Sequence, residues 1–354
     1  MVVEQKQTNI LAYEKYKTRS IFFLCFLALA LILSALLALR AGSYETSLVE
    51  IAKAIFGKAD AKMNTVVQNM RLPRVITAIL GGCGLGITGC VLQAVLHNPM
   101  ASASTLGISQ GATFGASFAI IVLSAGTQGN TGINFSNSLL ISLCAFICSM
   151  GVSALVLGLS RIKKITPESM ILVGVALSAM FQGGATLLQY FASEEQLTSV
   201  VFWTFGDLGR TGWKEIYIMA VVVLLACLFF MLKRWDYNAL ESGEQTAISL
   251  GVNVNRERIV NMIICSLTAS VIVSYVGLIN FIGLIAPHIV RRFIGNNHVY
   301  LLPCSALMGG VLLLLGDLGA RGIMSPVILP IGAITSFLGA PLFIYLIFKG
   351  GNKK

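Results

Sequence analysis

The chain has few charged residues for its length. Only 11% of its 354 residues are Asp, Glu, Lys or Arg, whereas 56% are hydrophobic. An average soluble domain is roughly 25% charged, and a soluble fold has no means of burying so much apolar surface. The scarcity of charge therefore excludes an ordinary soluble fold and predicts a membrane protein.

Motifs for catalysis and metal binding are also missing. The sequence contains no Walker A pattern, no nucleophile elbow and no His-Glu-x-x-His. Its eight cysteines lie in apolar stretches without metal-finger or thioredoxin spacing, so we expect free thiols that pack as small hydrophobes. The net charge of +10 comes without a basic face carrying interleaved aromatics, so nucleic acid is not predicted as a partner. We expect no catalytic residue, no metal site and no cofactor.

Long apolar runs are abundant and predict an all-α polytopic fold. A hydrocarbon core of about 30 Å needs roughly 20 apolar residues in a helix. Seven runs without Asp, Glu, Lys or Arg satisfy this: 20–39, 76–96, 106–123, 138–159, 170–191, 216–232 and 327–348. The run 259–290 is too long for one span and predicts two, with a turn near residues 277–280. A further span at 300–315, before Asp317 and Arg321, brings the predicted total to ten.

The distribution of positive charge predicts the orientation. With both termini in the cytoplasm, 16 of the 25 Lys and Arg residues fall on the inner side, as the positive-inside rule favours. Six of the other nine lie in the long connection between the first two predicted spans. The first span is not interpreted as a signal peptide, because its apolar core is too long and no cleavage site follows.

Local motifs add detail to three segments. Ser47-Leu-Val-Glu50 is a capping-box pattern and predicts a short amphipathic helix at the outer interface. Gly82-x-x-x-Gly86 predicts close approach of a neighbouring helix. The segment Thr166-Pro167-Glu168 combines an N-cap, a first-turn proline and an acid, so the fifth span should begin there.

The connection 233–258 is the largest on the inner side. A helix over 242–250, stopped by Gly251, is predicted within it. Docking onto a partner and a solvated connector are both compatible with such a helix. Ionisable residues are essentially absent from the predicted spans, whereas ion-coupled carriers usually place carboxylates there. His288, near the inner end of its span, is interpreted as a packing residue. Because the spans hold no carboxylates for ion coupling, we expect a separate protein to supply the energy for transport.

Several motifs together resemble one family. They are Arg71-Leu72-Pro73-Arg74, Asn98-Pro99-Met100-Ala101, Leu106-Gly107-Ile108-Ser109-Gln110-Gly111-Ala112, Gly174-Val175-Ala176-Leu177, Ala247-x-x-Leu250-Gly251-Val252, Phe281-Ile282-Gly283-Leu284-Ile285-x-Pro287-His288 and Pro330-Ile331-Gly332. Their types and order closely resemble the iron-siderophore, haem and vitamin B12 permease family of ABC importers. The resemblance runs from about the first span to the last.

The resemblance implies a type II ABC importer permease fold with ten transmembrane helices. It implies a second permease subunit, identical or paralogous, two cytoplasmic ABC ATPase subunits and an extracytoplasmic binding protein that delivers an iron-siderophore, haem or cobalamin ligand. It places the chain in the cytoplasmic membrane with both termini inside. The expected parts are an N-terminal tail (1–19), one permease domain (20–348) that includes the coupling loop (233–258), and a C-terminal tail (349–354).

Site residues are carried over from the family by position. Those expected to couple to the ATPase are Ser242, Glu244, Ala247, Leu250 and Gly251. Those expected to meet glutamates of the binding protein are Arg71, Arg74 and Arg321. Those expected near the cytoplasmic gate and the outer constriction are Thr166 and Pro167, and Ser193. A stand-alone secondary transporter or channel is the alternative, and a purely structural scaffold is a third.

Overall fold

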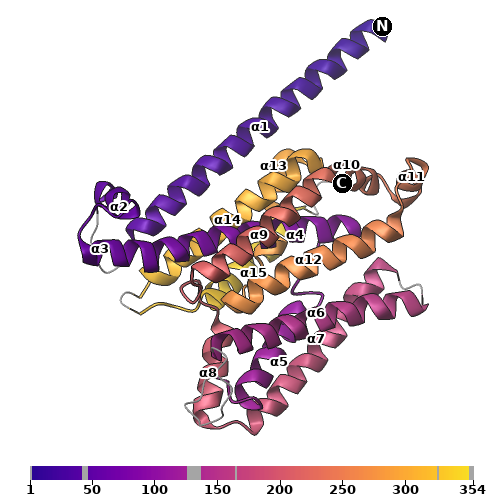
Figure 1. Cartoon of the computed structure of the whole chain (residues 1–354). Coiled ribbons are helices and arrows are strands. Elements are labelled where there is room, and N and C mark those ends of the chain that lie inside the picture. The colour runs from indigo at the N-terminus through magenta and orange to yellow at the C-terminus, as the bar shows by residue number, and fades with distance from the viewer. Residues whose placement is uncertain (1, 42–46, 126–136, 164–165, 325–326, 351–354) are drawn as a thin grey trace.

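The computed structural model describes residues 2–41, 47–125, 137–163, 166–324 and 327–350, and all regular structure in these ranges is helical. Figure 1 shows the arrangement. The helices are α1 (Val2–Arg40), α2 (Leu48–Ile55), α3 (Ala61–Val66), the π-helical turn η1 (Val67–Arg71), α4 (Leu72–Val95), α5 (Ile108–Ile121), α6 (Asn137–Lys163), α7 (Pro167–Tyr190), α8 (Glu194–Phe205), α9 (Trp213–Leu232), α10 (Arg234–Glu241), α11 (Glu244–Ser249), α12 (Val254–Val276), α13 (Ile282–Ile294), α14 (His298–Gly322) and α15 (Ile331–Gly350).

The described helices confirm a polytopic all-α protein. Seven of them are long and apolar enough to cross a membrane: Ala12–Arg40, Ala61–Val95, Ser138–Ser160, Pro167–Tyr190, Trp213–Leu232, Val254–Val276 and His298–Gly322. Two shorter apolar helices occupy Ile108–Ile121 and Ile331–Leu346, and α13 has 13 residues. The seven long helices do not reach the predicted count of ten spans, so that count stays a prediction.

Helix α4 lies at the centre of the bundle and contacts α14, α13, α12 and α9. Its contact with α14 depends on glycine. A Cβ added at Gly82 would lie 2.4 Å from the carbonyl oxygen of Gly309, and one added at Gly86 would lie 2.3 Å from that of Ser305. No side chain fits at such distances, because the opposing atoms are backbone. The predicted close approach at Gly82-x-x-x-Gly86 is therefore confirmed, with α14 as the neighbour.

The uncharged run 259–290 is divided as predicted. Helix α12 ends at Val276, and α13 begins at Ile282. Gly277 between them has φ +86°, a left-handed conformation that glycine adopts without strain. A Cβ there would also lie 2.5 Å from the carbonyl oxygen of Trp203. The turn thus needs glycine for its backbone conformation and for its contact with α8.

Helix α1 begins at Val2 and runs without a break past residue 20, and its first part projects from the bundle (Figure 1). The division into tail and domain at that residue stays a prediction. Helix α14 differs from expectation. Helix α14 does not end at residue 315 but continues to Gly322, which places Asp317 and Arg321 inside it. The two charges are four residues apart and pair with each other, so the helix can carry them.

The short helices α8, α10 and α11 also differ from expectation. Helix α8 was not predicted, although Ser193 and Gln196 form a capping box at its start. The helix predicted over 242–250 begins only at Glu244, because Gly243 has φ +106° and separates α11 from α10. Helix α10 itself was not predicted. The capped starts of α2 at Ser47 and of α7 at Thr166 are confirmed.

Candidate functional site

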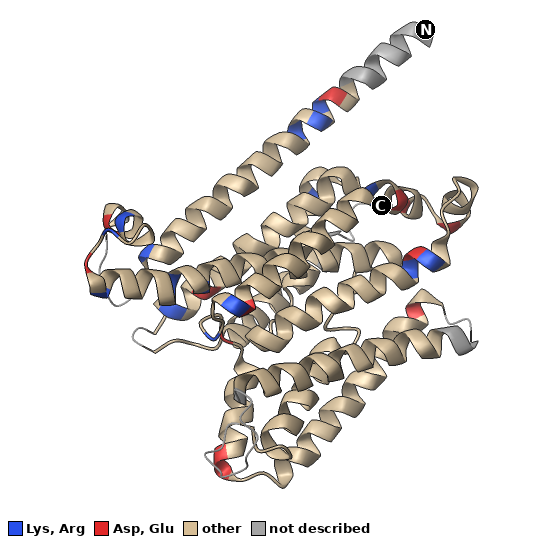
Figure 2. Cartoon of the chain, viewed as in Figure 1, with Lys and Arg blue, Asp and Glu red and all other residues tan. Residues whose placement is uncertain are grey.

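The three arginines expected to contact a binding protein lie together at one end of the bundle. We call this the arginine end. Arg74 is near the start of α4, Arg71 precedes it, and Arg321 is in the last turns of α14. Figure 2 shows that charged residues gather mainly at helix ends, with the long stretches between them uncharged. The three arginines, carried over from the family by position, thus share one end of the bundle, and their contact with a binding protein stays a prediction.

A buried carboxylate joins two of these arginines. Asp317 Oδ1 lies 2.9 Å from both Nε and Nη2 of Arg74, and Asp317 Oδ2 lies 2.9 Å from Nη2 of Arg321. The Asp317 side chain is 1% exposed, and the arginine side chains are 13% and 12% exposed. Asp207, which is 49% exposed, lies 3.3 Å from Nη1 of Arg74. Arg74 thus connects α4 to α14 and to the segment that follows α8.

Arg71 and Arg321 also close the end of helix α1. The last carbonyls of a helix have no partner within it and need donors from elsewhere. Arg71 donates from Nη1 to the carbonyls of Leu39 (2.9 Å) and Arg40 (3.4 Å). Arg321 donates from Nη1 to Ala41 (2.8 Å) and from Nη2 to Ala38 (3.2 Å). The last three carbonyls of α1 and that of Ala41, the next residue, are satisfied in this way.

Sequence reasoning missed these internal partners. It placed Asp317 in a loop after the ninth span and gave it no role. The spacing of Asp317 and Arg321, an acid followed by a base at i+4, was the available signal. The guanidinium groups are engaged within the chain, so an external carboxylate would have to share them or approach their exposed edges.

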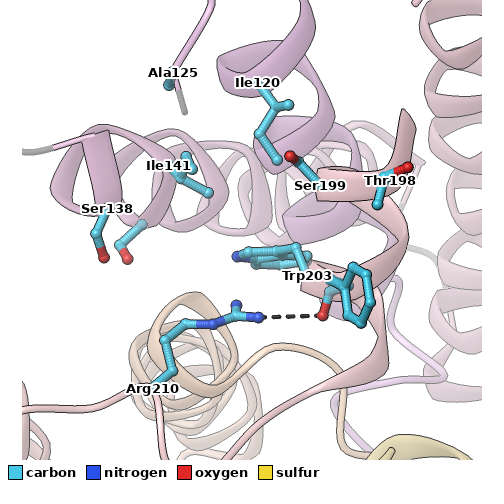
Figure 3. A pocket seen from close by; sticks show the side chains of 10 residues that line it. Ile120, Ala125, Ser138, Ile141, Thr198, Ser199, Trp203 and Arg210 are labelled. Atoms are coloured by element: carbon cyan, nitrogen blue, oxygen red, sulfur yellow. Dashed lines mark hydrogen bonds between the residues drawn. The ribbon is translucent and has the colours of Figure 1, made fainter. Parts of the chain in front are cut away.

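A cavity of about 420 Å³ lies near the arginine end, between α5, the start of α6 and α8. Figure 3 shows Trp203 along one wall, with Ser138 from α6 and Arg210 on either side of the open space. Arg210 donates from Nη2 to the carbonyl of Phe202 at 3.2 Å. The cavity thus combines one cation, several hydroxyls and an aromatic wall.

The opposite end of the bundle carries α10 and α11, and we call it the loop end. Helix α10 is held firmly there. Tyr237, which is fully buried, donates to Asn261 Oδ1 at 2.6 Å. Lys233 lies 2.7 Å from Glu257 and 2.9 Å from Asp236. Hydrogen bonds to these two carboxylates, Glu257 first, raise the pKa of Lys233, so the ammonium form is favoured.

Helix α11 is held less and exposes apolar side chains. Ala247 is fully buried, whereas Ile248 is 59% exposed and Leu250 is 68% exposed. Gly251 ends the segment at φ +85°, with open space where a Cβ would stand. Glu244 pairs with Arg258 of α12 at 2.5 Å. Of the residues expected to couple to an ATPase, Ala247 therefore anchors the helix, and Leu250 faces outward; Ser242 lies in the exposed link before it.

The residues expected near the gates lie on either side of α7, with Thr166 and Pro167 at its start and Ser193 beyond its end. Thr166 accepts a hydrogen bond from the Ser169 N–H at 3.4 Å, and Pro167 is the first residue of α7. Ser193 caps α8 and accepts from the Gln196 N–H, also at 3.4 Å. The structure does not bring these residues together. His288, interpreted as a packing residue, stacks edge-on against Phe343 of α15 with ring centroids 6.0 Å apart.

Comparison with known proteins supplies the family. A model of the FecCD transport family matches residues 30–349. The chain belongs to this family. A protein from Methanocaldococcus jannaschii, named an ABC transporter permease protein, is 48% identical, and the match covers 95% of this chain and 97% of that protein. The Fe(3+)-citrate import system permease protein of Bacillus subtilis is 34% identical, with 93% and 95% covered.

A solved structure agrees with the FecCD assignment. It is described as an inward-facing conformation of a metal-chelate type ABC transporter, and it matches with a TM-score of 0.80 and 32% identity. The match covers 92% of this chain and 98% of that one. The resemblance to the permease family of ABC importers is thus confirmed, and the chain is a multi-pass permease of the cell membrane.

Proposed function

We propose that this FecCD protein is the permease subunit of an ABC importer that carries a ferric chelate, with a ferric siderophore as the first candidate and haem and cobalamin as others. The support is the family, the iron-citrate relative and the metal-chelate type of the structural neighbour. The chain spans nearly the whole length of both of these proteins. No large part of either protein is missing from the match, which supports the same role for this chain.

The observation that carries the proposal is the exposed face of α11. Ile248 and Leu250 lie outside the long apolar helices, yet they present apolar side chains at the loop end. Short helices that expose such residues bind into grooves of partner proteins. We propose that this face, positioned by buried Ala247 and by the Glu244–Arg258 pair, docks a cytoplasmic ATPase. Two permeases and two ATPases would form the complete importer.

The arginine end would then face outward and receive a binding protein. Arg71, Arg74 and Arg321 bring three guanidinium groups to this end, and the carboxylates of Asp207 and Asp317 lie beside Arg74. Such a surface attracts carboxylates of a partner and steers its approach, with an effect that weakens in salt. In this orientation both termini are cytoplasmic.

The second permease subunit and the gates belong to the same proposal. Helix α7 is exposed along most of its length, with Leu172, Val175, Met180 and Leu187 among its exposed side chains. Helix α15 likewise exposes Phe337 at 80%. We propose that these helices face a second copy across the pathway. Thr166 and Pro167 would then lie at its cytoplasmic mouth and Ser193 near its outer constriction.

The test is reconstitution of the chain in vesicles with its ATPase and binding protein. We expect uptake of a ferric chelate only when all components and ATP are present, and stimulation of ATP hydrolysis by the loaded binding protein. Vesicles with the chain alone are the control. Uptake by the chain alone, without ATP, would establish the alternative of a secondary transporter or channel.

A further inference from the structure

A groove of about 320 Å³ lies between α6 and α12, on the half of the bundle nearer the loop end. Leu157 and Gly158 line it from α6, and Ile259 and Ile263 line it from α12. Gly158 and Ile263 are exposed, so the groove opens outward. Further along, Ser153 donates to Ser266 at 2.6 Å and joins the two helices. The lining between is almost wholly apolar.

Helical spacing puts an arginine above this groove on α12. On α12, Arg256, Ile259 and Ile263 are separated by three and four residues, so they share one face of the helix. This position lies toward the loop end, where α12 begins (Figure 1).

Arg256 differs from its charged neighbours in α12. Glu257 pairs with Lys233, and Arg258 pairs with Glu244. The Arg256 side chain is exposed and makes no ion pair or hydrogen bond with any residue that the structure describes. An exposed arginine with no partner in the chain, on the face that leads into an apolar groove, is suited to a ligand that is anionic at one end and apolar along its length.

We propose that this groove binds an anionic phospholipid, with its phosphate at Arg256 and one acyl chain between α6 and α12. The phospholipid belongs to the leaflet at the loop end, which is the cytoplasmic leaflet in the orientation proposed above. Basic pockets between membrane helices on that side bind anionic headgroups. A Cβ at Gly158 would meet nothing within 4 Å, so the space beside this residue is free. An acyl chain fits this free apolar space.

The test is native mass spectrometry of the purified chain with phosphatidylglycerol and, separately, phosphatidylcholine of the same acyl chains. We expect retention of phosphatidylglycerol, and about a fivefold loss in Arg256→Gln, which corresponds to about 1 kcal/mol for one basic residue at a membrane surface. Gly158→Leu should also reduce retention, because its side chain fills the groove. Inorganic phosphate, which lacks the chain, should not compete.

Two variants serve as controls. Arg292→Gln removes another exposed arginine, at the end of α13, and Gly183→Leu fills open space on α7. Neither should change lipid retention. Equal retention of the two lipids, or equal loss in Arg256→Gln and Arg292→Gln, would overturn the proposal. So would a loss of ATPase binding in Arg256→Gln with lipid retention unchanged, which would assign Arg256 to the ATPase surface. Lipid retention needs no transport, so it is independent of the proposed cargo.

Discussion

At the scale of single residues, the arginine end shows how one carboxylate organises several cations. Asp317 contacts two guanidinium groups at 2.9 Å, and one of them also reaches Asp207. Removing one partner from a buried ion pair leaves an uncompensated charge and costs about 3–5 kcal/mol, whereas exposed pairs contribute about 0–1 kcal/mol. Buried Asp317 should therefore contribute strongly to the free energy of unfolding, whereas exposed Asp207 should contribute little.

We predict that Asp317→Asn destabilises the protein strongly, because Arg74 and Arg321 lose their common counter-charge. Asp207→Asn is the matched control and should unfold at nearly the parental temperature. Thermal unfolding of both variants in the same detergent measures the difference. Equal midpoints for the two variants would show that Asp317 does not hold the cluster together.

Asp207→Asn also tests whether the arginine end docks the binding protein. Asp207→Asn raises the net charge of the cluster by one while keeping an oxygen for the Gly209 N–H and Arg74. We therefore expect tighter capture of the binding protein at low salt and no difference from the parent at high salt. Arg321→Glu is a poorer test, because it also removes donors from the end of α1. Unchanged affinity at low salt would argue against carboxylate recognition here.

At the scale of elements, two neighbouring glycines on α4 differ in what surrounds them: one faces the backbone of α14 and the other faces side chains. A Cβ at Gly82 would meet the backbone of Gly309 at 2.4 Å, whereas one at Gly81 would meet the side chain of Leu313 at 3.5 Å. The first distance requires α4 and α14 to move apart. The second is a normal van der Waals contact.

We predict that Gly82→Ala lowers the unfolding temperature, whereas Gly81→Ala leaves it equal or higher, because alanine favours a helix by about 1 kcal/mol over glycine. Thermal unfolding and yield of folded protein provide the measurement. If both variants behave alike, the α4–α14 contact is looser than the distances indicate.

Gly251 tests the proposal that α11 docks the ATPase. Gly251 has φ +85° with open space around its Cβ, so backbone conformation alone limits its replacement. We predict that Gly251→Val uncouples ATP hydrolysis from uptake, because a β-branched residue is strained at positive φ and shifts Leu250, while Gly251→Asn retains more coupling. Hydrolysis and uptake are measured in the same vesicles. Undisturbed uptake in Gly251→Val would remove α11 from the coupling surface.

The sequence predicted elements better than partners. Uncharged runs located the long helices, and the capping patterns at Ser47 and Thr166 located two starts. Helix α8 was missed because its apolar content is short and irregular. The role of Asp317 was missed because its partner Arg74 is 243 residues away, and no local pattern reports such a contact. The grouping of the three arginines came from the family resemblance.

At the scale of the whole molecule, we propose different partners for the two ends of the bundle, and the orientation of these ends in the membrane can be measured. We predict that a cysteine at Lys58, before α3, reacts with an impermeant maleimide in intact cells, whereas one at Ser249, in α11, reacts only in inverted vesicles. The parent chain, with its eight native cysteines, sets the background. The reverse pattern would place the termini outside.

The closure of helix α1 by distant arginines has a consequence for synthesis. Arg71 follows the end of α1 closely, whereas Arg321 donates to Ala41 from 280 residues further along the chain. The first helix enters the membrane early, but the Arg321 donor to its Ala38 carbonyl is translated only with α14. A nascent chain that stops before α14 would leave the end of α1 without this donor, so the state of α1 reports whether translation has passed α14.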